Sequence, residues 1–210
     1  KKKGIAFHSD AAQALGYLDL DPDKFRIDLM SLSAHKIYGP KGIGALVIRE
    51  GFPLEPSQYG GGQELGLRSG TLPVPLIVGF AKAVEITKND QDERNKRLLF
   101  FRNLLLSGLK KNISGLIVNG SIDQRLPHNL NITFPGVKGS QLHGQLRRFI
   151  FCTSGSACSN GEASHVLQEI GLSKKDAEAS IRMSIGRNTT EKDINKAINI
   201  ITNIVINLRQ

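Results

Sequence analysis

The sequence contains no tryptophan, only two cysteines and no long hydrophobic run. A membrane-spanning helix needs about 20 consecutive apolar residues, which no segment approaches. The KKKG start leads into one short strand-like run rather than the longer apolar core of a signal peptide. A composition with 40% hydrophobic and 22% charged residues over 210 positions is typical of a globular chain with a sizeable core. We therefore expect a soluble, cytoplasmic protein without a membrane partner.

Basic residues outnumber acidic ones by 28 to 19, which gives a formal net charge of +9. Basic surfaces attract nucleic acids, anionic membranes and acidic partners. Here the basic residues are scattered along the chain in short groups, without the interleaved aromatic residues of RNA-binding modules. The composition therefore argues against a nucleic-acid partner and leaves an anionic cofactor or an acidic partner.

The two cysteines, Cys152 and Cys158, are six positions apart, which fits neither a C-x-x-C motif nor a four-ligand zinc site. We expect no metal site, and a disulfide is disfavoured in a reducing cytosol. Cys152 follows the apolar run RFIF and is expected to be packed. Cys158 lies in SGSACSNGE, a composition typical of a loop.

Three short apolar runs, at residues 4–10, 25–34 and 42–49, predict strands of a sheet covered on both faces. A long loop rich in glycine and proline follows at residues 55–75, and long ordered loops are often functional.

From Pro75 onward the pattern turns helical, and later segments alternate between strand-like and helix-like. We predict a strand-and-loop half at residues 1–90 and a smaller α+β half at residues 91–210. The last helix is expected to begin at a cap formed by Thr189 or Thr190.

Two polar segments come directly after predicted strands: HSD at residues 8–10 and SAHK at residues 33–36. Ligand groups gather at the carboxyl ends of strands in open α/β sheets, so Asp10 and Lys36 are predicted to face one crevice. A desolvated lysine is readily deprotonated and condenses with aldehydes, and an acid beside a pyridine nitrogen completes the pairing used with pyridoxal phosphate. Spacing alone leaves open that Lys36 is a solvated surface residue. The nearby segment GPKGIG does not have the P-loop pattern, so it is not predicted to be a phosphate-binding P-loop.

Five segments carry a resemblance to a known family, in this order: HSDAAQ, SLSAHKIYGPKGIGAL, GGGQELGLRSGTLP, TSGSACS and SIRMSIGR. Together they resemble the NifS/IscS-like cysteine desulfurases, which are class V, fold-type I pyridoxal-phosphate enzymes. The resemblance implies an α/β fold comprising the C-terminal part of the large mixed-sheet domain and the small α+β C-terminal domain.

By resemblance, pyridoxal 5'-phosphate is the cofactor and Lys36 forms its Schiff base and moves protons at the substrate. Asp10 is implied to pair with the pyridinium nitrogen, and Gln13 to donate to the phenolic oxygen. Ser33 and His35 are implied to hold the phosphate. Thr71 resembles the residue that reaches the phosphate in the neighbouring subunit, which implies a homodimer; the alternative is an ordinary loop hydroxyl.

Cys158 resembles the nucleophile that takes sulfur from L-cysteine as a persulfide, with L-alanine as the other product. Arg182, within the apolar segment SIRMSIG, is implied to bind the substrate carboxylate, although an internal salt bridge is an alternative. The expected partners are an iron–sulfur scaffold or another sulfur acceptor. Rival functions are a selenocysteine lyase, an aminotransferase or an inactive truncated scaffold.

Two departures from the family pattern accompany this resemblance. The chain starts at what corresponds to the middle of the large domain, so it is expected to lack the amino-terminal part and the cofactor ligands found there. Only five residues, SNGEA, separate Cys158 from SHVL, which is slightly shorter than the longer family versions.

Overall fold

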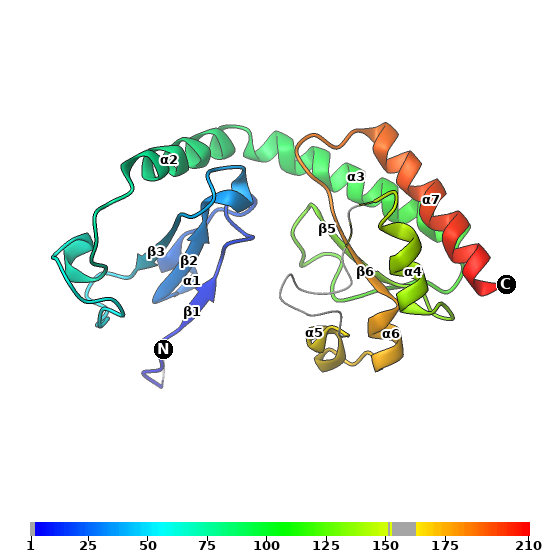
Figure 1. The fold of residues 1–210 in the computed structure, drawn as a ribbon, viewed down its shortest axis with the longest axis horizontal. Helices are drawn as coiled ribbons and strands as arrows, with labels where there is room; N and C mark the ends of the chain where they lie inside the picture. The colour runs from blue at the N-terminus through cyan, green and yellow to red at the C-terminus, as the bar shows by residue number, and fades with distance from the viewer. Residues whose placement is uncertain (1–2, 151, 153–162) are drawn as a thin grey trace. The chain divides into compact units, whose positions relative to one another are not determined.

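The computed structural model describes residues 3–150, 152 and 163–210 (Figure 1). The chain divides into two compact units, Lys1–Gln91 and Asp92–Gln210.

The first unit contains a three-stranded sheet in the order β1-β2-β3. β1 pairs with β2 in parallel, and β2 pairs with β3 in antiparallel fashion. The elements are β1 (His8–Asp10), α1 (Pro22–Phe25), β2 (Leu29–Ser33), the 3₁₀ helices η1 (Ala34–Ile37) and η2 (Glu64–Gly66), β3 (Gly44–Ile48) and α2 (Val74–Asn89). All three predicted strands are confirmed, each shorter than its apolar run.

One face of this sheet forms a small core. Met30 packs with Ala11 and Ile27, while Ala34 and Ile37 of η1 form a second cluster with residues of α2. Gly39 permits this approach of α2, because a Cβ there would lie 3.0 Å from the Cβ of Ala83 in α2. The core face therefore holds η1, which carries Lys36, against α2.

The opposite face is exposed, so the prediction of a sheet covered on both sides is wrong for the described chain. Cross-strand register places Asp10 beside Ser31, and Ser31 beside Leu46. Leu46 is 46% exposed although its segment is strongly apolar. The described residues of this unit pack on one side only, because successive strand side chains point to opposite faces and α2 and η1 cover just one of them.

The second unit contains an antiparallel sheet in the order β4-β5-β6. Its elements are α3 (Gln91–Asn112), β4 (Ile117–Val118), β5 (Asn129–Thr133), α4 (Gly139–Leu146), α5 (His165–Glu169), α6 (Lys174–Glu178), β6 (Ser180–Ser184) and α7 (Glu191–Arg209). Helix α6 was not predicted, because five residues are too few to show helical periodicity.

Helix α7 begins where the sequence predicts. The hydroxyl of Thr190 accepts from the backbone N–H of Asp193, and the Asp193 carboxylate accepts from the backbone N–H of Thr190. This reciprocal pair is a capping box, so Thr190 rather than Thr189 is the cap.

A buried histidine precedes β5 and makes stability depend on pH. Burial lowers the pKa of His128 from 6.5 to about 4, so the unfolded chain binds this proton more readily than the folded chain. This group does not lower the stability of the folded chain above about pH 6.5. As the pH falls from there toward 4, the folded chain loses stability, because the unfolded chain takes up a proton that the folded chain does not. We expect the free energy of unfolding in urea to fall by about 2 kcal/mol between pH 7 and pH 5 because of this group.

His128→Gln should remove that fall, whereas the control His165→Gln, at an exposed position of α5, should keep it. An unchanged pH dependence in His128→Gln would contradict the assignment. Burial also lowers the pKa of His143, which remains in both variants and shifts their baselines equally.

Candidate active site

The carboxyl ends of β1 and β2 lie next to each other, as predicted. Asp10 ends β1 and is paired with Ser31 of β2. One carboxylate oxygen of Asp10 accepts from the backbone N–H of Ala12 at 2.9 Å, which holds the carboxylate at the start of the following turn. Asp10 is exposed and keeps acceptor capacity for another donor.

Lys36 lies on η1, which begins directly after β2 and ends at Tyr38, a residue with φ of 64°. Ala34 and Ile37, which are one turn of the 3₁₀ helix apart, are buried against α2, and Lys36 is left exposed. The expectation of a desolvated lysine is therefore not met within the described chain. The physical reason is that only one side of η1 is covered by packing.

Ser33 and His35 bracket the lysine and contact each other. The Ser33 hydroxyl and Nδ1 of His35 are hydrogen-bonded at 2.9 Å, and His35 is exposed. A hydroxyl and an imidazole joined in this way still offer the second ring nitrogen to an anion. The pair is thus prearranged as a donor group next to Lys36.

Two further polar side chains on the same face were missed in the sequence. Nε2 of His8 is hydrogen-bonded to the hydroxyl of Ser31 at 2.8 Å, which ties β1 to β2 beside Asp10. His8 and Ser31 lie in the segments HSD and SLSAHK, but their contact depends on the register between β1 and β2.

Gln13 is exposed in the turn that follows Asp10, and Thr71 is exposed at the end of the long loop. This loop has its own internal structure. The Ser69 hydroxyl donates to the carbonyl of Tyr59 at 3.0 Å, and Gln63 accepts from the backbone N–H of Gly70 at 3.1 Å. Thr71 therefore lies, exposed, at the end of a loop with internal hydrogen bonds, in the segment predicted to be a loop.

Arg182 lies in β6 of the second unit and is half-buried. Its neighbours Ile181 and Met183 are buried on the apolar face, and Arg182 points to the opposite face. The guanidinium is therefore not enclosed by the apolar side chains of its own strand, because alternation separates it from those neighbours. Within the described residues the guanidinium forms no hydrogen bond or ion pair, so no internal salt bridge is seen there.

Of the two cysteines, only Cys152 belongs to the described residues. Cys152 is half-buried, and burial raises the pKa of its thiol, which disfavours the nucleophilic thiolate. This agrees with the packing role predicted for Cys152. Cys158 lies outside the described residues.

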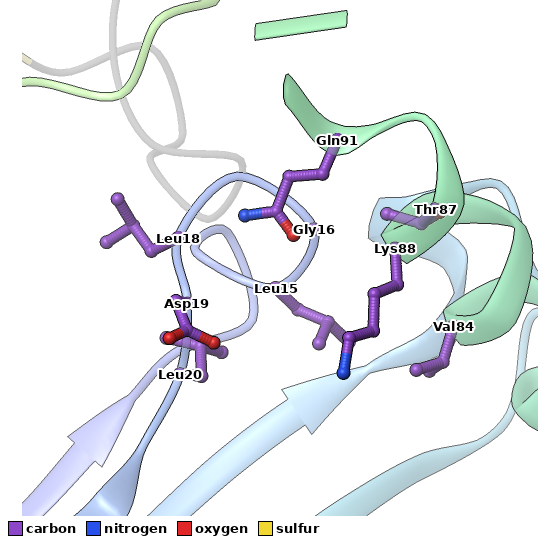
Figure 2. Close-up of a pocket in the computed structure, with 9 residues that line it drawn as sticks. All are labelled: Leu15, Gly16, Leu18, Asp19, Leu20, Val84, Thr87, Lys88 and Gln91. Atoms are coloured by element: carbon purple, nitrogen blue, oxygen red, sulfur yellow. The ribbon is translucent and has the colours of Figure 1, made fainter. Parts of the chain in front are cut away.

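A small cavity of about 140 Å³ lies in the first unit, between the turn after β1 and the end of α2 (Figure 2). Leu15, Val84 and Lys88 are among its lining residues, and none of the predicted site residues lines it. In the described ranges no cluster of three or more potential metal ligands is found. No helix in the same ranges has the length and hydropathy needed to cross a membrane.

Known proteins share both the fold and the sequence pattern of this chain. Solved structures with the same fold include a NifS-like protein, with a TM-score of 0.86 and 36% identity, which covers 99% of this chain and 54% of that one. A NifS-like protein from Rickettsia africae has a TM-score of 0.86 and 30% identity, covering 97% of this chain and 54% of that one. The fold is thus that of fold-type I pyridoxal-phosphate enzymes, as predicted.

The family model "Aminotransferase class-V" matches residues 1–197, and the chain belongs to this family of pyridoxal-phosphate-dependent enzymes. Among curated proteins, the cysteine desulfurase IscS of Vibrio vulnificus is 47% identical over 213 residues, which is all of this chain and 52% of that protein. IscS of Rickettsia rickettsii is 43% identical over the same share of each. The chain therefore spans about half the length of the curated relatives it matches.

Proposed function

We propose that this chain is the C-terminal part of a pyridoxal-phosphate-dependent cysteine desulfurase. In the reaction, L-cysteine and an acceptor thiol give L-alanine and a persulfide. The first unit corresponds to the C-terminal part of the large cofactor-binding domain, and the second to the small domain with the cysteine loop. The similarity to cysteine desulfurases over the full chain supports this assignment.

The observation that carries the proposal is the grouping of polar side chains at the carboxyl ends of the parallel pair β1 and β2. Asp10, Ser33 and His35 follow these ends, together with Lys36 on η1. This is the edge of an α/β sheet where ligands bind. A carboxylate, an exposed amine and a hydroxyl–imidazole pair are the groups that a phosphorylated pyridine aldehyde requires.

The residues present therefore fit pyridoxal phosphate, which when bound supplies an electron sink for bond breaking at the substrate. Lys36 would hold it covalently, Asp10 would bind its ring nitrogen and Gln13 its phenolic oxygen. Ser33 and His35 would bind the phosphate, with Thr71 contributing from a neighbouring subunit.

The chain's own groups then have separate tasks. Lys36 Nζ, which is exposed, takes and returns a proton at the substrate Cα. Arg182 holds the substrate carboxylate through two parallel N–H donors. Cys158 Sγ attacks the substrate sulfur and retains it as a persulfide until an acceptor collects it.

The test is to supply the purified chain with pyridoxal phosphate, reduce it with borohydride and locate the added mass by peptide analysis. We expect one cofactor per chain, attached at Lys36, and L-alanine formation when L-cysteine is added. Absence of a reducible adduct would refute cofactor binding by this chain. An adduct without alanine would refute the desulfurase reaction but leave cofactor binding intact.

We also propose that the protein is a cytoplasmic homodimer that delivers sulfur to an iron–sulfur scaffold or another acceptor. The loop before Thr71 supports the dimer, because Tyr59 is 78% and Leu65 is 97% exposed. Glu64 and Leu65 both have positive φ, an arrangement that costs energy and persists where surrounding contacts maintain it. An ordered loop with exposed apolar residues is suited to a subunit contact.

Substituting Leu65→Ser is expected to shift the protein from dimer toward monomer, because it removes an apolar anchor from that contact. Light scattering coupled to size-exclusion chromatography would measure the mass. Leu18→Ser, at an exposed apolar position away from the loop, is the control. Equal masses for the wild type and both variants would contradict the role of this loop.

A further inference from the structure

The end of the long loop before α2 is fixed by two hydrogen bonds within the loop itself. The buried Ser69 donates its hydroxyl proton to the carbonyl of Tyr59 at 3.0 Å. The backbone N–H of Gly70 donates to Oε1 of Gln63 at 3.1 Å, and Gly70 has a φ of 103°, which favours glycine. The backbone on the amino side of Thr71 is therefore held in one conformation.

The side chain of Arg68 folds along this fixed backbone. Its terminal nitrogen Nη1 donates to the carbonyl of Ser69 at 2.9 Å. The same nitrogen would lie 3.1 Å from a Cβ at position 70, so the guanidinium occupies the side of Gly70 where a larger residue would carry its side chain. A positive charge is thus held one residue before Thr71.

Most donors of Arg68 remain available. A guanidinium carries several N–H groups, and the carbonyl of Ser69 is the one hydrogen-bond partner of Arg68 among the described residues. Arg68 and Thr71 are both exposed, and the Thr71 hydroxyl makes no hydrogen bond to any other described residue. Nε and Nη2 of Arg68 can therefore donate to a ligand together with the hydroxyl of Thr71.

A guanidinium and a hydroxyl on one fixed segment form a donor set for an oxyanion. Arginine binds phosphate oxygens through parallel N–H donors, and such charge-assisted hydrogen bonds are stronger than neutral ones. Figure 1 shows the loop between β3 and α2 extending away from the three-stranded sheet of its own unit. The donor set is therefore suited to a site on a neighbouring subunit.

We propose that Arg68 is an additional ligand of the cofactor phosphate in the neighbouring subunit, acting beside Thr71. A phosphate ester carries about two negative charges near neutral pH, whereas hydroxyls and a neutral imidazole bring no positive charge to it. Arg68 supplies that charge. This inference rests on the proposed function, which assigns the protein to a homodimer and Thr71 to that phosphate.

The first experiment measures the affinity of the protein for pyridoxal phosphate, as the amount of borohydride-reducible adduct at Lys36 against cofactor concentration. We expect Arg68→Gln to weaken binding roughly tenfold or more, since hydrogen bonds to a charged group are lost. Arg148→Gln is the matched control and should bind as the wild type does. Arg148 is an exposed arginine of the second unit whose side chain makes no hydrogen bond within the described chain.

Pyridoxal, which lacks the phosphate, separates a ligand of the phosphate from a support of the loop. The difference between the wild type and Arg68→Gln should vanish with this probe. A difference that persists with pyridoxal would overturn the inference, because general damage to the loop would then explain it.

Mixed dimers test whether Arg68 acts on the neighbouring subunit. A dimer of one Lys36→Ala chain and one Arg68→Gln chain has a single Lys36, and its site receives the intact Arg68 of the partner subunit. We expect wild-type affinity there. A dimer of one wild-type chain and one chain with both substitutions also has a single Lys36, but its site receives the substituted position 68, so we expect the weakened affinity. The opposite order would overturn the inference.

Failure of this inference is distinguishable from failure of the proposed function. Wild-type affinity of Arg68→Gln for pyridoxal phosphate would overturn the role of Arg68 and leave the cofactor site standing. A wild-type protein that forms no adduct, or that is monomeric, would refute the proposed function or its homodimer, and this inference with it.

Discussion

Replacing Lys36 by alanine is expected to abolish conversion of L-cysteine to L-alanine, with a loss of roughly 10²- to 10⁴-fold or more. The variant loses both the amine that holds the cofactor covalently and the base that moves the proton at the substrate Cα. The measurement is alanine formed per chain in the presence of pyridoxal phosphate, with borohydride reduction and intact mass taken on the same samples. No pyridoxyl adduct should be found in Lys36→Ala.

Lys41→Ala is the matched control, because Lys41 is also an exposed lysine in the same turn region. It follows η1 instead of lying on it, and is expected to keep full activity and the adduct. If Lys36→Ala retained the borohydride adduct, another lysine would carry the cofactor and the arrangement at the end of β2 would have no catalytic meaning. Loss of function in both variants would point to a general effect of positive charge at this turn.

Replacing Cys158 by alanine is expected to remove sulfur transfer while leaving the cofactor adduct at Lys36 unchanged. The reason is that the two residues act on different atoms: Lys36 at the substrate Cα and Cys158 at its sulfur. Sulfide release in the presence of a reductant, and persulfide labelling of the protein, would both fall to background. Sulfur release at the wild-type rate would contradict the desulfurase assignment.

Cys152→Ala is the control for this experiment. Burial raises the pKa of the Cys152 thiol, so this group is largely protonated near neutral pH and is a poor nucleophile. Cys152→Ala should therefore keep wild-type sulfur transfer, with only a stability loss from the smaller side chain. Persulfide found on Cys152 in the wild type would reverse the roles assigned to the two thiols.

Local elements were predictable because their signals are contiguous in the sequence. The three strands of the first unit follow from apolar runs, and α7 follows from its cap and helical periodicity. The same local information predicted that HSD and SAHK follow neighbouring strands. It did not predict which residues would be exposed, as Leu46 and Lys36 show.

Burial of these residues depends on which layers cover the sheet, and that depends on contacts between distant segments. Arg182 is an instructive case, since apolar residues flank it in the sequence. Strand alternation instead places it on the polar face, opposite Asn131. Residues 131 and 182 are far apart in the sequence, so only the pairing of β5 with β6 makes them neighbours.

The sequence by itself determined the family, the fold class and the residue types at the strand ends, because each depends on short motifs in a given order. The tertiary structure alone decided how residues of different strands meet: His8 with Ser31, and Asn119 with Thr133 and Ser180. The physical reason is that a hydrogen bond between strands depends on register. Register is selected by the packing of whole sheet faces, which no local pattern contains.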